Sequence, residues 1–294
     1  MVRKSESDGI NSLVALATCA EVPALDEDGP ALLAALQTHG VEGIPAVWDS
    51  PAVDWERFEL VVVRSTWDYA ERRGEFLDWA ARLPRVLNPL PVLRWGTDKR
   101  YLAELEAGGV PVVPTRFLEP GEAFEPPAGR FVVKPVFSAG GRASARYEAE
   151  GAHAAAAHVD ALHAEGRAAM VQPHVDGVET AGEIALIFLG GAYSHAVRKR
   201  VSLRHGEAES PELYLEETVE AAEPSAADLD VAEAALATAP FAERLLYARV
   251  DLVHDPDPLV LELELAEPSL YLGHAEGSAE RFARLIADAL APRG

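Results

Sequence analysis

The segments YARVDLV (247–253) and LVLELEL (259–265) lie near the carboxyl end of the chain, joined by HDPDP. Two apolar runs separated by a short loop of Asp and Pro residues predict an antiparallel β-hairpin. Successive side chains of a strand point to opposite faces, so the leucines of the second run share one face and Glu262 and Glu264 share the other. The function inferred for this chain depends on whether these glutamates bind a cation or are exposed to solvent.

The register of this hairpin decides whether Asp251 joins the two glutamates. A symmetric loop pairs Asp251 with Leu261, whereas a one-residue bulge or a shorter loop pairs it with the glutamates. Arg249 lies two residues before Asp251 and therefore shares its face. Three carboxylates on one face cannot all stay ionised without a cation, and oxygen-rich clusters of this kind suit Mg²⁺ or Mn²⁺ together with nucleotide phosphates. The alternative is a half-exposed strand with a solvated acidic face.

A second hairpin is predicted in EIALIFLGGAYSHAVRKR (183–200), with its turn at Gly190-Gly191. Its second strand ends in three consecutive cations, which include Arg198 and Lys199. In so acidic a chain, a concentrated cationic strand end favours a local anionic partner such as a polyphosphate or a carboxylate. A solvated basic edge is the alternative.

A lysine also precedes a loop of small residues. Lys134 ends an apolar run, and SAGGR (138–142) follows it. Because glycine carries no side chain, backbone amides in such a loop can approach phosphate oxygens, and the lysine adds a charge. A plain turn is the alternative. The chain contains neither the P-loop nor the dinucleotide glycine pattern, so both of those chemistries are disfavoured.

The amino-terminal part alternates apolar runs with helical patterns, which predicts a parallel α/β sheet over residues 11–93. LVALAT (13–18) and ELVVVR (59–64) are its clearest strands. Ligands of parallel sheets gather where strands end, so Arg64, Ser65 and Asp68 become candidates for gripping an amino-acid-like group. Residues 1–10 are expected to form a loose, disordered tail.

Composition excludes several classes of function. The 294 residues carry 26 Lys and Arg against 48 Asp and Glu, a formal net charge of −22, which disfavours binding to nucleic acid or to anionic lipid. One cysteine, Cys19, cannot form a disulfide framework within the chain and fits a reducing compartment. With no membrane-length apolar run and no signal peptide, a cytoplasmic protein is expected. A homodimer is the base-rate expectation for its assembly.

These pieces, taken in chain order, resemble the ATP-grasp superfamily of carboxylate–amine ligases over nearly everything from residue 11 to 294. The motifs that carry the resemblance are Asn88-Pro89, Asp98-Lys99, Val133-Lys134-Pro135 with the glycine loop, Val171-Gln172-Pro173, Arg249-Val250-Asp251 and Glu262-Leu263-Glu264. The segments STWDY, VETAGEIALIF, SHAVRK and ELAEPSLYL are most similar to the branch that contains the cycloserine-forming O-ureidoserine cyclo-ligase. The common pattern ends in Glu-x-Asn, where this chain has Glu264.

The resemblance implies an α/β fold of three parts that clamp a nucleotide. The parts are a parallel lead-in domain (11–93), a small lobe (94–170) and a carboxyl-terminal lobe with an antiparallel sheet and the metal site (171–294). It also implies residue roles. Lys99 and Lys134 would contact ATP phosphates under the loop that contains Ser138, Gly140, Gly141 and Arg142. Gln172 and Val175 would hold adenine, and Glu179 the ribose. Arg198 or Lys199, with Arg249, would act on the transferred phosphoryl group, and Asp251, Glu262 and Glu264 would hold Mg²⁺.

The function implied is ATP-dependent activation of a carboxylate as an acyl phosphate, followed by attack of an amine or a similar nitrogen nucleophile. The substrates would be small carboxylates and amines of amino-acid type, and the most specific version is cyclisation of an O-substituted serine in antibiotic biosynthesis. Two alternatives stay open: a small-molecule kinase on the same scaffold, and a non-catalytic nucleotide-binding regulatory protein.

Overall fold

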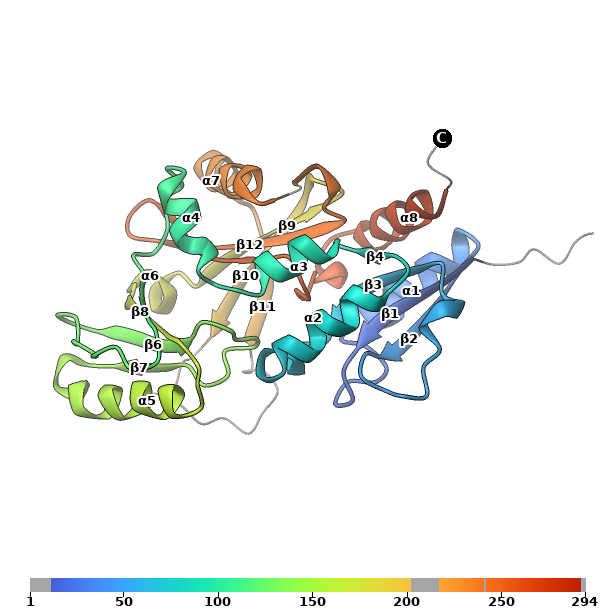
Figure 1. Cartoon of the computed structure of the whole chain (residues 1–294). Helices are drawn as coiled ribbons and strands as arrows, with labels where there is room; N and C mark the ends of the chain where they lie inside the picture. The colour runs from blue at the N-terminus through green and yellow to red at the C-terminus, as the bar shows by residue number, and fades with distance from the viewer. Residues whose placement is uncertain (1–11, 202–216, 241, 292–294) are drawn as a thin grey trace, which may run out of the picture.

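The computed structural model describes residues 12–201, 217–240 and 242–291, so the tail expected over residues 1–10 lies outside the described residues. The described residues form three β-sheets with helices packed against them (Figure 1). None of the described helices is both long and apolar enough to cross a membrane.

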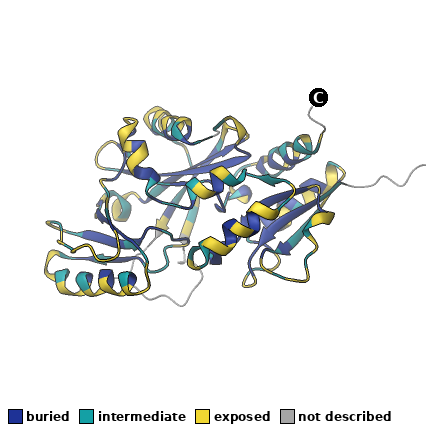
Figure 2. Cartoon of the chain, viewed as in Figure 1, coloured by how far each residue is buried: buried dark blue, intermediate teal, exposed yellow. Residues whose placement is uncertain are grey.

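The amino-terminal sheet is parallel, as the alternation of strands and helices predicted. Its strand order is β2-β1-β3-β4, and its elements are β1 (Ser12–Thr18), α1 (Gly29–Thr38), β2 (Val41–Val47), β3 (Leu60–Ser65), α2 (Arg73–Arg82) and β4 (Val86–Leu87). Both faces of its central strands are buried, which Figure 2 shows in dark blue. Val14 and Leu16 pack toward α1 and α8 (Ser278–Leu290), whereas Ala15 and Ala17 pack toward α2. Burial on both faces explains why these strands read as continuous apolar runs.

The middle sheet is antiparallel, with strand order β5-β8-β6-β7. Its strands are β5 (Arg116–Leu118), β6 (Phe131–Pro135), β7 (Ala145–Tyr147) and β8 (Ala169–Pro173), and α5 (Ala152–Ala164) covers one face. Since β8 runs to Pro173, this sheet extends past the boundary expected at residue 170. The open face of the sheet carries Lys134 and Gln172 toward the rest of the molecule.

The third sheet is antiparallel, with order β11-β10-β9-β12-β13. Its strands are β9 (Glu183–Leu189), β10 (Ala192–Val201), β11 (Glu217–Ala222), β12 (Tyr247–His254) and β13 (Pro258–Glu264), and α6 (Gly177–Thr180) precedes β9. Helices α3 (Leu90–Gly96), α4 (Tyr101–Ala107) and α7 (Ala226–Thr238) supply residues to the core on one side of it. The apolar residues of α4 thus share one core with the third sheet and with Val136, Ala168 and Met170 of the expected small lobe.

Asn88 joins the amino-terminal sheet to the third sheet. The side chain is fully buried, and its amide Nδ2 donates to the carbonyl oxygens of Tyr247 at 3.0 Å and Leu265 at 2.8 Å. Its Oδ1 accepts a hydrogen bond from the Leu246 amide at 2.7 Å. A shared apolar core, which includes Tyr247 and Phe282, adds to this connection. These two sheets thus form one packed body, on which the middle sheet is mounted.

Candidate active site

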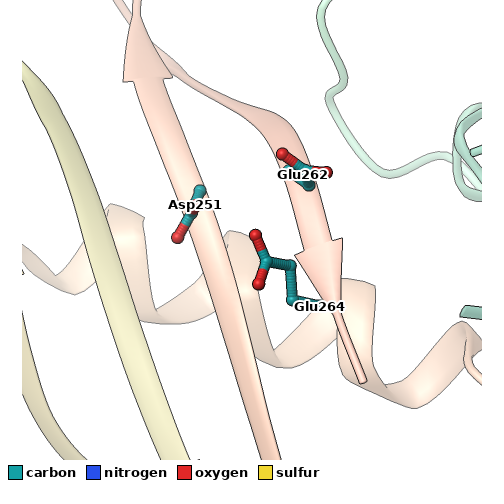
Figure 3. A group of neighbouring side chains, drawn as sticks. All are labelled: Asp251, Glu262 and Glu264. Carbon is teal, nitrogen blue, oxygen red and sulfur yellow. The ribbon is translucent and has the colours of Figure 1, made fainter. Parts of the chain in front are cut away.

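The hairpin of β12 and β13 contains the bulge that the sequence left open. Asp251 pairs with Glu262 and Arg249 with Glu264, whereas Leu252 pairs with Val260, so Leu261 is the extra residue. The bulge brings carboxylate oxygens of Asp251, Glu262 and Glu264 within 4.8 Å of one another. Figure 3 shows the three side chains on the two adjacent strands, with the Glu264 carboxylate turned toward Asp251.

Arg249 and Lys199 neutralise the buried end of this cluster. Arg249 donates through Nε to Asp251 Oδ1 at 2.9 Å, and through Nη2 to Asp251 Oδ2 at 3.0 Å and to Glu264 Oε1 at 2.5 Å. Lys199 Nζ donates to Asp251 Oδ2 at 2.7 Å and lies 3.0 Å from Glu183 Oε2. Burial alone would raise the pKa of Asp251, but these two cations hold it at about 2.

The donor set fits a hard divalent cation. All three candidate ligands are carboxylates, and oxygen is the donor that Mg²⁺ and Mn²⁺ prefer. The Glu262 and Glu264 side chains keep 22% and 23% of their surface exposed, toward the cavity, whereas Asp251 lies behind them. Lys99 forms an ion pair with Glu262. Burial raises the pKa of Glu264, and a bound cation would reverse that shift.

A cavity of about 1110 Å³ opens in front of the cluster, bounded by strand residues of the middle and third sheets and by the segments that follow β1 and β3 of the amino-terminal sheet. The sequence-predicted residues that line it are Lys99, Lys134, Ser138, Gly140, Gly141, Gln172, Val175, Glu179, Lys199, Arg249, Glu262 and Glu264. The structure therefore brings the predicted nucleotide, catalytic and metal residues to one cavity from segments far apart in the chain. Such a concave site with converging polar groups is the form that small-molecule sites take.

Lys99 and Lys134 lie close enough for their charges to interact, at the end of the cavity expected to hold the phosphates. Burial, and then the nearby Lys99, lower the pKa of Lys134 to about 7. Burial also lowers the pKa of Lys99. Two close amines in a desolvated cavity favour an anionic ligand, since an anion would relieve both effects. Gly140 and Gly141 in the adjoining loop adopt positive φ angles of 61° and 72°, which glycine tolerates without strain.

At the expected adenine end, Gln172 is buried and its Nε2 donates to Thr115 Oγ1 at 2.8 Å, which fixes the orientation of the amide. Val175 lies beside it in the cavity wall. Glu179, at the cavity rim, forms ion pairs with Arg130 and Arg146, so its carboxylate is held in place.

Two of the predicted cations lie outside the cavity. Arg198 donates through Nη1 to the Ala181 carbonyl at 2.8 Å, and the alternation of the strand directs Lys199 instead into the site. Arg142 belongs to the glycine loop, but its guanidinium group forms an ion pair of 2.7 Å with Glu71, in the turn that follows β3. Of the pair left open by the sequence, Lys199 is thus the residue that faces the cavity.

The three predicted substrate residues are not brought into the cavity either. Arg64 is 1% exposed and lies 3.7 Å from the carboxylates of both Asp26 and Asp28. Ser65 shares a hydrogen bond of 2.8 Å with Thr18. Asp68 accepts from Trp48 Nε1 at 2.8 Å and pairs with Arg72. The predicted strand end adjoins the cavity, but these three side chains are engaged with other protein groups and do not line it.

Sequence reasoning missed Trp67, Tyr69, Glu267 and Tyr271, which do line the cavity. Trp67 and Tyr69 lie on a 3₁₀ turn, Trp67–Glu71, where alternation along a strand no longer predicts direction. Glu267 is 6% exposed, and the Tyr69 hydroxyl lies close enough to lower the pKa of its carboxyl. Burial and the neighbouring Glu264 raise the pKa of Glu267 to about 8. The only signal for these residues was the segments STWDY and ELAEPSLYL, which entered the argument as resemblance alone.

The segment after β13, Leu265 to Leu272, is held by side chains from many parts of the fold. Its carbonyl oxygens accept hydrogen bonds from Asn88 (Leu265), Tyr247 (Ala266), Trp67 (Glu267), Arg64 (Pro268), Arg249 (Ser269), His195 (Leu270) and Ser278 (Leu272). The Asp28 carboxylate accepts from the amides of Leu270 and Leu272, at 2.9 and 2.6 Å. We call residues 265–272 the clamped loop; it forms one wall of the cavity.

Comparison with known proteins finds relatives along almost the whole chain. Residues 14–88 match the model of the D-cycloserine synthetase DcsG amino-terminal domain. The cycloserine biosynthesis protein DcsG of Streptomyces lavendulae is 41% identical over 300 residues, covering 95% of this chain and 99% of that protein. The crystal structure of D-cycloserine synthetase DcsG superimposes with a TM-score of 0.86 at 39% identity, covering 95% of this chain and 100% of the other.

More distant structures share the fold. D-alanine–D-alanine ligase from Bacillus anthracis superimposes with a TM-score of 0.67 at 13% identity, covering 95% of this chain and 97% of that one. An ATP-grasp RimK domain protein from Sphaerobacter thermophilus gives 0.62 at 18% identity, covering 95% and 99%. The expected fold class is therefore confirmed. The chain belongs to the DcsG family of ATP-dependent ligases, and its fold is ATP-grasp.

Proposed function

We propose that this protein uses Mg-ATP to convert a substrate carboxylate into an acyl phosphate, which a nitrogen nucleophile then attacks. The observation that carries the proposal is the meeting of two charge groups in one cavity. Carboxylates of Asp251, Glu262 and Glu264 stand beside four cations, namely Lys99, Lys134, Lys199 and Arg249. Phosphoryl transfer to a carboxylate needs such an arrangement, because both reactants are anions that must approach each other.

In the first step the substrate carboxylate would attack the γ-phosphorus of ATP, and the bond to the β–γ bridging oxygen would break to release ADP. Lys99 and Lys134 would hold phosphate oxygens, while Lys199 and Arg249 lie where they would reduce the repulsion between the anions. Glu262 and Glu264 would hold Mg²⁺, which when bound supplies neutralisation of charge on the transferring group.

In the second step the nitrogen nucleophile would add to the acyl carbon, and phosphate would leave from the tetrahedral intermediate. An acyl phosphate is destroyed by water, so the site must exclude it. The position of the cavity among three sheets supports such exclusion, as does the ion pair between Arg142 of the glycine loop and Glu71. Closure of that loop over the nucleotide would complete the enclosure.

We propose further that the carboxylate and the nitrogen belong to one molecule, an O-substituted serine, and that ring closure gives a cycloserine-type product in antibiotic biosynthesis. The support is similarity to the cycloserine biosynthesis protein over 95% of this chain at 41% identity. A ring-closing reaction also needs only one substrate pocket beside the nucleotide.

The test is ADP release from Mg-ATP in the presence of a panel of amino acids that includes O-ureidoserine, with mass spectrometry of each product. We expect ADP, free phosphate and a cyclised or condensed product. ADP with a stable phosphorylated product would instead establish a kinase. Nucleotide binding without ADP release from any member of the panel would favour the regulatory protein.

A further inference from the structure

The cavity contains a buried carboxyl group to which the proposed reaction assigns no task. Glu267 lines the cavity and is 6% exposed. Three other buried or half-buried acidic residues of the cavity wall already form ion pairs: Glu262 with Lys99, Glu264 with Arg249, and Glu183 with Lys199. Asp28 binds the clamped loop, and Asp26 lies beside Arg64. Among the described residues, Glu267 forms no ion pair within 4 Å, although Lys99, the Tyr69 hydroxyl and Arg249 are close enough to lower the pKa of its carboxyl.

The position of Glu267 is fixed before any substrate arrives. Its own carbonyl accepts from Trp67 Nε1 at 3.1 Å, and the carbonyls on either side are held by Tyr247 at 2.7 Å and by Arg64 at 3.0 Å. Burial keeps the Tyr69 hydroxyl protonated by raising its pKa well above the ordinary value, so the hydroxyl donates to the carboxylate. A carboxylate has more acceptor sites than one donor fills, and the remaining sites are available to a ligand.

The clamped loop also sets the distance between Glu267 and the cations. Arg249 Nη1 donates to the carbonyl of Ser269, two residues after Glu267, at 3.1 Å. A buried carboxyl group and a fixed cation therefore lie near each other on the same wall. Burial and Glu264 favour the protonated form of this carboxyl, with a pKa of about 8, and an ammonium group bound beside it would shift it to the carboxylate. An α-amino acid carries its ammonium and its carboxylate on one carbon, so it offers the complementary pair at short separation.

We propose that Glu267, positioned by Tyr69, binds the α-ammonium group of the substrate while Arg249 and Lys199 face its carboxylate. This inference rests on the proposed function for the reacting carboxylate, and it adds a residue that determines specificity. A 2-hydroxy acid lacks the ammonium, so the Glu267 carboxyl would lose the charged hydrogen bond that the ammonium donates, and binding sites built on such a bond discriminate strongly against a ligand without it.

The test compares the binding of O-ureidoserine with that of its 2-hydroxy analogue, by calorimetry in the presence of Mg-ADP. For the wild-type protein we expect the amino compound to bind at least about 30-fold more tightly, as the loss of a charged hydrogen bond predicts. Glu267→Gln should bind the amino compound about 30-fold more weakly and the hydroxy analogue within threefold of wild type. Tyr69→Phe should lose part of the preference. The matched control, exposed Glu276→Gln in the segment just beyond the clamped loop, should leave both affinities unchanged.

A wild-type protein that does not distinguish the two compounds, or binds neither, would overturn the inference, and so would a Glu267→Gln variant that keeps the full preference. Unchanged affinity for Mg-ADP in each variant shows that the fold is intact. Failure of the proposed function is a separate outcome: the ammonium preference would be present in binding, but ATP would yield no ADP.

Discussion

At the scale of single residues, Arg249 illustrates how this site is organised before it binds anything. All three nitrogen atoms of its guanidinium group donate, to Asp251, to Glu264 and to the carbonyl of Ser269. A side chain held at so many points loses little further freedom when a ligand arrives, so its positive charge is already oriented. The same is true of Lys199, which lies between Asp251 and Glu183.

Glu262 is the carboxylate whose loss should be most informative. In Glu262→Gln the side chain keeps its size, but Lys99 loses its ionic partner and the proposed metal loses a charged ligand. We expect turnover to fall at least about 100-fold while the fold is retained. ADP release and circular dichroism check this, with exposed Glu280→Gln on α8 as the control. Turnover at the wild-type level in Glu262→Gln would contradict the metal assignment.

Lys134 should make nucleotide binding depend on pH near neutrality. With a pKa of about 7, its amine carries a charge below pH 7 and loses it above, whereas bound phosphate would favour the charged form. Affinity for a non-hydrolysable ATP analogue should therefore fall between pH 7 and pH 8.5, by up to about tenfold per pH unit. Lys134→Met should bind more weakly at pH 6.5 and lose most of this dependence. Calorimetry at several pH values measures both, and an unchanged pH profile in Lys134→Met would refute the assignment.

The same lysine has the opposite effect on the unliganded fold. Between pH 7 and pH 10.5 the unfolded chain binds a proton at this residue that the folded protein does not, so its contribution makes the free energy of unfolding rise with pH in that window. Ligand binding and unliganded stability should thus respond to pH in opposite directions.

At the scale of elements, the hairpin of β12 and β13 shows where prediction from sequence stops. Its two strands were readable from their apolar runs, but the bulge at Leu261 was one of two open registers. The structure gives the reason. The edge of β13 at Val260 hydrogen-bonds the segment around Val112, through Val260 N to Pro111 O at 2.9 Å and Val113 N to Val260 O at 3.0 Å. A contact with a segment about 150 residues earlier cannot be read from the hairpin itself.

The residues predicted to contact the substrate lie near the cavity, but their side chains do not line it. The end of β3 was identified, yet Arg64, Ser65 and Asp68 turn inward and Trp67 and Tyr69 face the cavity. A short 3₁₀ turn follows the strand there, and neither strand nor α-helix periodicity describes it. Glu267 was missed because it lies beyond the last regular strand, in a loop whose course depends on side chains from the whole molecule.

Asn88 provides a test of the junction between two sheets. In Asn88→Ala the carbonyls of Tyr247 and Leu265 and the amide of Leu246 lose their partner in a buried environment. We expect the free energy of unfolding to fall by about 2–4 kcal/mol, measured by urea denaturation. Thr238→Ala, which removes a hydroxyl bonded to its own helix α7, should change it by less than about 0.5 kcal/mol. If Asn88→Ala also lowered the free energy of unfolding by less than about 0.5 kcal/mol, the junction would not depend on this amide.

At the scale of the whole molecule, the apolar cores indicate how the parts are coupled. The apolar core under the amino-terminal sheet includes residues of β9, β12 and α8, so it belongs equally to the third sheet. The middle sheet packs one face on α5, while Met170 of β8 and the adjoining Val136 and Ala168 belong to the core of the third sheet. We therefore expect the middle sheet and α5 to move as a unit over the cavity when nucleotide binds, pivoting at this shared contact.

The net charge of −22 should make stability depend on salt. At about 10 mM salt the screening length is about 30 Å, comparable to the size of the molecule, and at physiological salt it shrinks to about 8 Å. Repulsion among the acidic side chains is thereby reduced, so Tm should rise by a few degrees from 10 to 150 mM NaCl in a thermal melt. The same rise in KCl would indicate screening rather than specific binding, and a fall in Tm would contradict this account.

The clamped loop has a consequence for handedness. Because side chains from three regions of the fold hold its successive carbonyls, the loop cannot shift to accommodate a ligand of a different shape. Once the ammonium and the carboxylate of an amino acid meet their proposed partners, the side chain of one enantiomer extends into the cavity, whereas that of its mirror image is directed against the rigid wall. Supplied with a racemic amino acid, such a wall would take one enantiomer and leave the other in solution.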